Sequence, residues 1–327
     1  MENLIESYNS SVNAIIESEL ATETELLDLK HKNLATKKLL KRYDFFQKYM
    51  EHLNFENPHF VFGDTDNYNA WAYRDSQKSV IMIESKFFID LDRFYNSARE
   101  KVLDYYSSKD LTMAFDGALT PDIIMSQLMK MFLFYHESAH IIQQQSPNLF
   151  DGIIDESKND EFLMVDHVGE IDADLHASRK IAEHLSNIFH RDSSSFHELD
   201  PKKYLEDLCI TTISSYLFCR MLIFDNYSTF YTKKHSHPHI LIRMQATMVD
   251  IIKVVQLHTG LVLDTDRVFN YLLSVTDLLC TTHSSLQSVS TFLGMSVTHS
   301  GDISEYYDEL IKIIRSNKKT VYNKMSL

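Results

Sequence analysis

Apolar residues recur every three to four positions along most of this chain, which is the spacing of one buried face of an α-helix. From residue 90 onward the pattern is nearly continuous, and it predicts helices at about 91–107, 121–145, 166–190, 201–225, 237–258, 265–294 and 302–318. Thr120 and Pro121 suit the N-cap and the first position of the second of these helices. The sequence therefore predicts a mainly helical protein.

The first 54 residues hold neither Gly nor Pro and carry apolar residues at helical spacing among many charges. We predict an N-terminal helical segment over residues 1–54, in one long or two shorter helices, followed by a larger domain over residues 55–327. Because heptads are not sustained, a helical layer packed on that domain is favoured over a coiled-coil or partner-binding arm.

A β-hairpin interrupts the helical pattern. Residues 70–73 and 79–83 are rich in aromatic and β-branched side chains, and a polar turn separates them. Two interpretations stay open: a small structural sheet, or an edge strand to which a peptide substrate adds as a further strand. The expected fold class is mainly α, of the α+β kind, with a small hairpin or sheet.

Composition excludes several classes of protein. With 7 Gly and 5 Pro in 327 residues, tight turns are few, which disfavours a β-sandwich. The 46 acids against 32 bases give a net charge of −14, so nucleic acid is not expected as a partner. No segment reaches the roughly eighteen apolar residues of a membrane span, and the first residues lack a signal-peptide pattern. We therefore expect a cytoplasmic protein without a membrane partner.

The three cysteines, Cys209, Cys219 and Cys280, lie inside apolar helical patterns and match no metal-binding spacing. They are expected to be buried free thiols.

The stretch HESAH at positions 136–140 is the strongest chemical signal in the sequence. Residues four apart lie about 40° apart around a helix and roughly 6 Å along it, so the imidazoles of His136 and His140 can reach one metal ion. Glu137 can hold a water molecule without being a ligand. This is the HExxH arrangement of zinc hydrolases, and a chance match among 16 histidines is the alternative.

A zinc site needs a third protein ligand. A metzincin would have Gly at 143 and His at 146, and this chain has Gln143 and Ser146, which excludes that class. Downstream, Glu170 can complete a His₂Glu set, and Asp174, one helical turn later, can hydrogen-bond a ligand imidazole. A solvated acidic helix face is the alternative. Four more residues compete with Glu170 as the third ligand: Asp166, His167, Asp172 and His176. His167 is the strongest of these competitors. The other interpretation is that these four lie at the surface or behind the ligands.

These motifs resemble those of the gluzincin metallopeptidases, and most closely the family of the phage-exclusion protein Lit, peptidase family U49. The run EIDADLHA at 170–177 is similar to the ExxADxHA pattern of that family. His237 and Pro238, followed by Arg243, resemble an HPxxxxR motif found there and in membrane-linked M48-type peptidases. The run NAWA at 69–72 resembles a degenerate form of the strand before the catalytic helix in M48-type relatives.

The resemblance implies a zincin-like metallopeptidase core within residues 55–327 and one Zn²⁺ per chain. It implies that His237 stabilises the oxyanion, that Arg243 positions His237 or a carboxylate, and that Asn69 and Ala70 contact the substrate. From composition alone, the His-rich tract at 235–239 is a solvated or weakly metal-binding segment. The 29 residues between His140 and Glu170 exceed the spacing in the family, and residues 1–54 have no counterpart there.

The expected activity is zinc-dependent hydrolysis of peptide bonds in an intracellular protein. Zn²⁺ is expected on His136, His140 and Glu170, with Glu137 as the general base. The resemblance further implies a role in phage defence or in a prophage-borne attack on a host protein, such as a translation elongation factor. The rival interpretation is a non-catalytic, metal-stabilised interaction or regulatory protein, for which a general base at position 137 would have no use.

Overall fold

The computed structural model describes residues 2–29, 34–109, 111, 120–145, 163–192, 200–223, 229–283 and 289–324. The chain divides into two compact units. Met1–Arg93 and His136–Pro147 form the first unit, and Phe94–Tyr135 and Asn148–Leu327 form the second. Two long helices, α3 (Ser85–Ser108) and α4 (Pro121–Gln144), contribute residues to both units.

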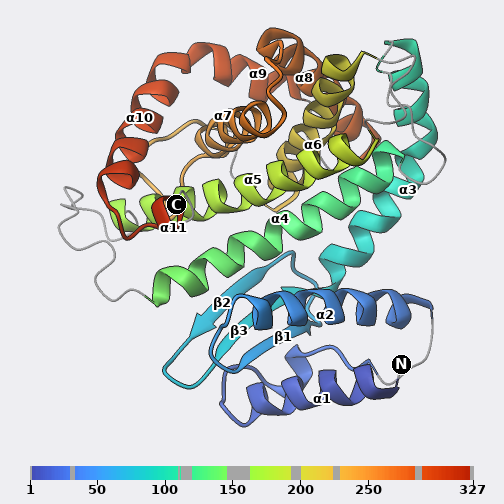
Figure 1. Cartoon of the computed structure of the whole chain (residues 1–327), viewed down its shortest axis with the longest axis vertical. Helices are drawn as coiled ribbons and strands as arrows, with labels where there is room; N and C mark the ends of the chain where they lie inside the picture. The colour runs from blue at the N-terminus through green and yellow to red at the C-terminus, as the bar shows by residue number, and fades with distance from the viewer. Residues whose placement is uncertain are drawn as a thin grey trace. The chain divides into compact units, whose positions relative to one another are not determined.

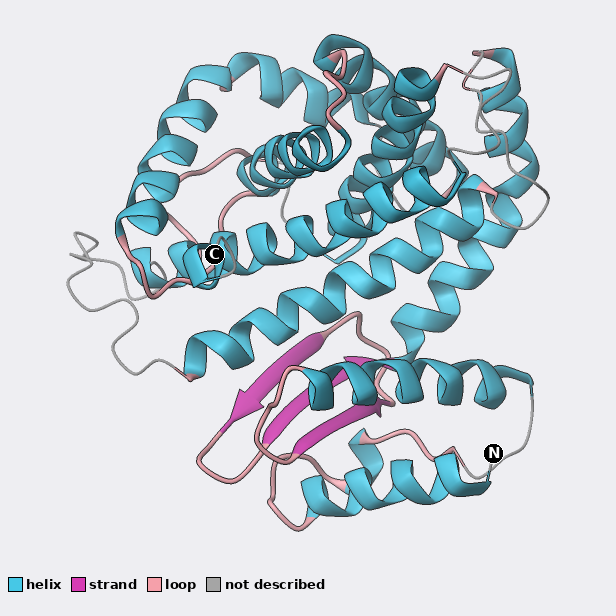
Figure 2. Ribbon diagram, in the orientation of Figure 1, coloured by secondary structure: helices cyan, strands magenta, loops and turns pink. Residues whose placement is uncertain are grey.

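The first unit contains a three-stranded sheet (Figure 2). Its strands are β1 (Pro58–Gly63), β2 (Ala70–Arg74) and β3 (Ser79–Glu84), in the order β1-β3-β2. β3 is the central strand, and all six of its residues are buried. It pairs antiparallel with β2, which confirms the predicted hairpin, and parallel with β1. β2 is an edge strand, and its residues are half-buried.

Two N-terminal helices, α1 (Glu2–Ile16) and α2 (Leu34–His52), belong to the same unit as the sheet. The hydroxyl of buried Tyr8 on α1 donates to the carbonyl of Leu27 at 2.9 Å. Phe46 on α2 packs on Phe60 of β1, with ring centroids 5.0 Å apart, and on Phe88, at 6.0 Å. The two helices therefore form a layer on the sheet, held by aromatic packing.

The second unit is helical in all its described parts (Figure 1). Besides the shares of α3 and α4 it contains α5 (Met164–Asp192), α6 (Pro201–Ile223), α7 (Ile240–Thr259), α8 (Thr265–Thr282), α9 (Val289–Thr298), α10 (Ser300–Ser316) and α11 (Val321–Lys324). α5 packs chiefly against α7, and α6 against α8. The expectation of a mainly helical chain with a small sheet is confirmed.

The single helix predicted over 265–294 is wrong, because α8 ends at Thr282 and α9 begins at Val289. Near the end of α8 two side chains bond back to the helix: Thr281 Oγ1 to the carbonyl of Asp277 at 2.9 Å, and Thr282 Oγ1 to that of Leu278 at 2.8 Å. Such bonds compete with continued helix formation, so the apolar periodicity alone did not locate this end.

The predicted helix start at residue 237 is also wrong, because α7 begins at Ile240. His239 is the N-cap, and its Nδ1 accepts the backbone N–H of Leu241 at 3.2 Å. Residues 237–239 therefore belong to the segment that precedes α7. At the start of α4, Pro121 is the first helical residue as expected, but the Thr120 hydroxyl has no hydrogen-bond partner within the described chain.

Cys209, Cys219 and Cys280 are buried and free, as predicted. Burial raises the pKa of each thiol and so keeps it protonated. Among the described helices, none combines the length and the apolar character needed to cross a membrane.

Asp250 on α7 supplies a test of the packing in the second unit. Its carboxyl group is buried, one oxygen has no hydrogen-bond partner within the described chain, and burial raises its pKa from 3.8 to about 6. The raised pKa means that the folded state loses stability as pH rises from about 4 to 6 and the carboxyl group ionises. Asp250→Asn should therefore stabilise the protein by up to about 2–3 kcal/mol above pH 7.

The measurement is denaturant unfolding at pH 4.5 and pH 7.5. The gain from Asp250→Asn should be small at the lower pH, and the exposed control Asp308→Asn should show none at either pH. A gain that is equal at the two pH values would contradict the assignment of a strained buried carboxylate.

Candidate metal centre

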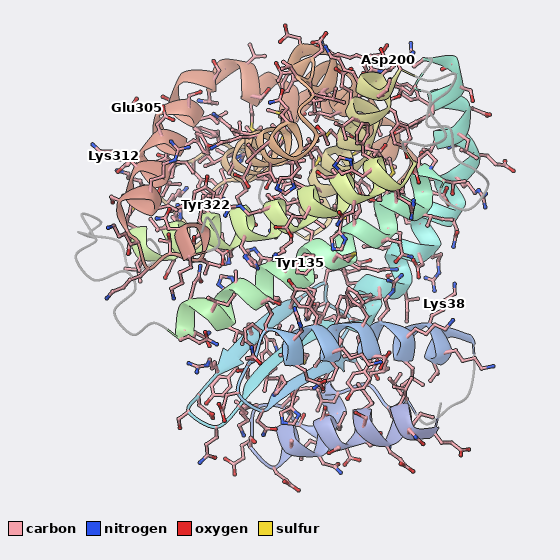
Figure 3. The ribbon with its side chains drawn as sticks, in the orientation of Figure 1. Lys38, Tyr135, Asp200, Glu305, Lys312 and Tyr322 are labelled. Atoms are coloured by element: carbon pink, nitrogen blue, oxygen red, sulfur yellow. The ribbon has the colours of Figure 1, made fainter. Side chains whose placement is uncertain are left out.

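The helix α4 carries the HESAH stretch in its C-terminal half. Tyr135, labelled in Figure 3, is buried, and a hydrogen bond of 2.8 Å joins its hydroxyl to His184 Nε2 on α5. His136 and Glu137 are also buried, and His140 is half-buried. Buried ionisable groups are costly unless they have partners, so their presence on an apolar helix indicates function.

The two histidines point their Nε2 atoms toward each other, 3.2 Å apart. His140 Nδ1 lies 2.8 Å from Gln143 Oε1, one helical turn later. Because the amide oxygen can only accept, His140 Nδ1 carries the proton and its Nε2 presents a lone pair. A neutral imidazole with its proton fixed on the far nitrogen is the form that ligates a metal.

Glu170 on α5 completes a group of three. His136, His140 and Glu170 each offer one ligand atom, and these atoms all lie within 4.8 Å of one another. Within the described residues this is the group of histidines and acids that could hold a metal ion. The metal site predicted from the sequence is thus supported at the level of its three side chains.

The donor set fits a divalent metal such as zinc. Two nitrogens on a tetrahedral Zn²⁺, each about 2.0–2.1 Å from the ion, lie about 3.3 Å apart, close to the observed 3.2 Å. Two imidazoles and one carboxylate are the ligands of a catalytic site that keeps one position open. The same donors also accept other first-row divalent ions.

Glu170 is held by residues of its own unit. Its Oε2 lies 2.9 Å from a terminal nitrogen of Arg243, and its Oε1 lies 3.6 Å from Nε2 of His237. The fold therefore brings His237 and Arg243, the two residues suggested by the sequence motif, to Glu170. The Glu170 side chain is only 14 % exposed, so these contacts restrict how it can turn.

Asp174 has two arginine partners. Arg243 donates to both of its oxygens, from Nε at 2.6 Å and from a terminal nitrogen at 2.8 Å, and Arg220 on α6 donates at 2.7 Å. Arg243 and Asp174 have no exposed side-chain surface. Burial alone would lower the pKa of Arg243, but the carboxylates of Asp174 and Glu170 raise it above its usual value, so Arg243 stays charged.

The four residues that compete with Glu170 for the third-ligand position are not members of this group. His167 uses both ring nitrogens on protein partners, the carbonyl of His235 at 2.5 Å and the hydroxyl of Tyr306 at 2.9 Å. The carboxylate of Asp172 accepts the backbone N–H groups of Val321 and Tyr322, each at 2.9 Å. Of the remaining two, Asp166 is exposed and His176 is buried.

Asn69 and Ala70 lie where β2 begins. The carbonyl of Asn69 accepts the N–H of Glu84 at 3.0 Å, and its side-chain oxygen accepts the N–H of Ala70 at 2.9 Å. Two residues along the same edge strand, the carbonyl of Ala72 accepts from Gln144 Nε2 at 3.4 Å. The end of α4 and the edge strand are thus neighbours inside the first unit. Residues 146–160, which follow α4, lie outside the described residues.

Two members of the centre were missed from the sequence. Gln143 was noted only for excluding a metzincin, although its spacing of three from His140 puts both on one helix face. Arg220 lies in the apolar run of α6, and a buried arginine requires an acidic partner, here Asp174. No protein-family model, no curated protein and no solved structure matches the chain.

Proposed function

We propose that this chain is a zinc-dependent endopeptidase of the gluzincin kind, with His136, His140 and Glu170 as the metal ligands. The observation that carries the proposal is the convergence of these three ligand atoms within 4.8 Å, with the acid Glu137 directly after the first histidine. A zincin-like core and a gluzincin relationship are proposals that rest on the sequence motifs.

A bound Zn²⁺ would lower the pKa of a water molecule and polarise a carbonyl oxygen. Glu137 has the chemistry of the general base: its carboxylate takes the proton of the attacking water and passes it to the leaving amine. The Glu137 side chain is buried, on the helix that carries both histidines.

The edge strand β2 supports an extended peptide as the substrate. A peptide can add to an exposed sheet edge through main-chain hydrogen bonds, and Gln144 ties the end of α4 to Ala72 of this strand. Asn69 and Ala70, where β2 begins, are proposed to contact the substrate. This is the peptide-binding alternative left open by the sequence.

His237 is proposed to stabilise the negative charge that develops on the carbonyl oxygen. Its side chain is 46 % exposed, and its Nε2 lies 3.6 Å from Glu170 Oε1. Arg243 and Asp174 are proposed to orient Glu170, since Arg243 forms ion pairs with both carboxylates. A cytoplasmic location, a host protein substrate such as an elongation factor, and a role in phage defence are extensions that rest on the family resemblance alone.

Metal content tests the proposed ligands. The wild-type protein should bind about one Zn²⁺ per chain, and His136→Ala, His140→Ala and Glu170→Ala should each bind well below one, because a three-ligand site cannot spare a donor. Inductively coupled plasma mass spectrometry after dialysis against trace zinc measures the stoichiometry.

The matched controls are His258→Ala and Asp166→Ala, which remove an exposed histidine and an exposed acid outside the group. Both should keep full metal content. Full zinc occupancy in Glu170→Ala would show that the third ligand is another residue, and a metal-free wild type under saturating zinc would overturn the proposed function.

A further inference from the structure

His237 is an exposed side chain beside Glu170. Its side chain is 46 % exposed, its Nε2 lies 3.6 Å from Glu170 Oε1, and its Nδ1 lies 2.9 Å from Ser236 Oγ. The place of an exposed side chain depends on the backbone that carries it. The residues that fix the backbone of the segment 229–239 therefore decide whether His237 faces Glu170.

One anchor of this segment is a buried imidazole on α5. His167 has no exposed surface, and its Nε2 lies 2.5 Å from the carbonyl oxygen of His235, two residues before His237. Because that carbonyl can only accept, Nε2 carries the proton, and Nδ1 must then accept the hydroxyl proton of Tyr306 at 2.9 Å. All three groups are satisfied by one tautomer.

His167 acts through these hydrogen bonds and not through charge. Burial lowers its pKa to about 4, so the ring is neutral at physiological pH and cannot pair electrostatically with Glu170. Tyr306 on α10 is also buried, and Lys233 of the segment lies over its ring, 5.7 Å from the centroid, while bonding to Glu309 at 2.9 Å. Tyr306 thus bonds to His167, and His167 bonds to the carbonyl of His235; we call this pair of side chains the bracket.

The other end of the segment is fixed at α7. His239 is buried and caps that helix, and Tyr231 packs against both His235 and His239, with ring centroids 4.4 and 5.0 Å apart. His167 lies one turn before Glu170 on α5, and His239 lies one turn before Arg243 on α7. The segment is thus attached to the same two helices that hold Glu170 in place.

We infer that His167 and Tyr306 are positioning residues that hold the backbone at His235 and thereby place His237 beside Glu170. The inference rests on the proposed function for its catalytic consequence, while the placement itself can be measured without any activity. Loss of the bracket should release the segment and lower turnover, with metal content unchanged.

The first measurement is hydrogen exchange on the full-length protein. Tyr306→Phe removes one hydroxyl and His167→Phe removes both hydrogen bonds, so amides of residues 229–239 should exchange about five- to tenfold faster than in wild type. Tyr307→Phe, which alters the neighbouring tyrosine of α10, is the matched control and should change nothing in this segment. Unchanged exchange in both bracket variants would overturn the inference, whatever the activity of the protein.

The second measurement separates positioning from general stability by a double-mutant cycle. His167→Phe should lower kcat about ten- to hundredfold with little change in KM, and it should have almost no further effect in a His237→Ala background. His167→Gln keeps an N–H donor toward His235 and should restore most of the rate. Equal losses of kcat with and without His237 would overturn the positioning role. A wild-type protein without hydrolysis would contradict the proposed function, and hydrogen exchange alone would then test whether His167 and Tyr306 hold the segment.

Discussion

Glu137→Gln is expected to lose hydrolysis by about 10²–10⁴-fold while it keeps metal, fold and partner binding. The amide has the shape of the carboxylate but cannot take a proton from water, and Glu137 is not among the three side chains whose ligand atoms converge. The change therefore removes the general base alone. In a bacterial host, new protein termini and any growth defect should appear with wild type and be absent with Glu137→Gln.

The metal content and the unfolding transition of Glu137→Gln must be measured together with the protein termini in the host, since a variant that lost its metal would also be inactive. Glu183→Gln on α5, where the acid pairs with Lys180 at 3.0 Å, is the matched control and should behave as wild type. If Glu137→Gln retained metal and produced the same cellular effect as wild type, the chain would be a metal-stabilised interaction protein and not a protease.

Local signals in the sequence located most elements. α4 was predicted over 121–145 and runs from Pro121 to Gln144, because the proline suits a first helical position and the apolar spacing continues to its end. The hairpin was also predicted, since its two strands and turn are contiguous. The parallel pairing of β1 with β3 does not follow from the sequence, because no local pattern determines that Phe60 pairs with Ile81.

The three metal ligands could be predicted from residue spacing on single helices. The residues that hold the ligands in place could not be predicted in this way. Arg220 and Asp174 are 46 residues apart in sequence, and Asp172 meets the backbone of Val321 across 149 residues. His167 was considered as a metal ligand because it lies close to Glu170 in the sequence. Its partners at positions 235 and 306 come from two other elements, and only tertiary structure shows that both ring nitrogens are already used.

Arg243→Met is expected to destabilise the second unit by about 3–5 kcal/mol, the usual result of removing one partner from a buried ion pair. The side chains of Arg243 and Asp174 are fully buried, and Arg243 also holds Glu170 at 2.9 Å. Without Arg243, Asp174 keeps its ion pair with Arg220, but Glu170 loses its arginine. Arg243→Lys keeps the charge but loses the two-pronged contact with Asp174, so a smaller destabilisation is expected.

Arg267→Met separates loss of stability from loss of the metal site. Arg267 also joins two buried acids, Glu206 at 2.9 Å and Asp207 at 2.6 Å, and neither belongs to the metal group. Both methionine variants should unfold at lower denaturant concentration, but only Arg243→Met should weaken zinc binding, by about ten- to a hundredfold, because it frees Glu170 to turn. Competition with a zinc chelator measures the affinity. Equal zinc affinities in the two variants would mean that Arg243 stabilises the helices without orienting the ligand.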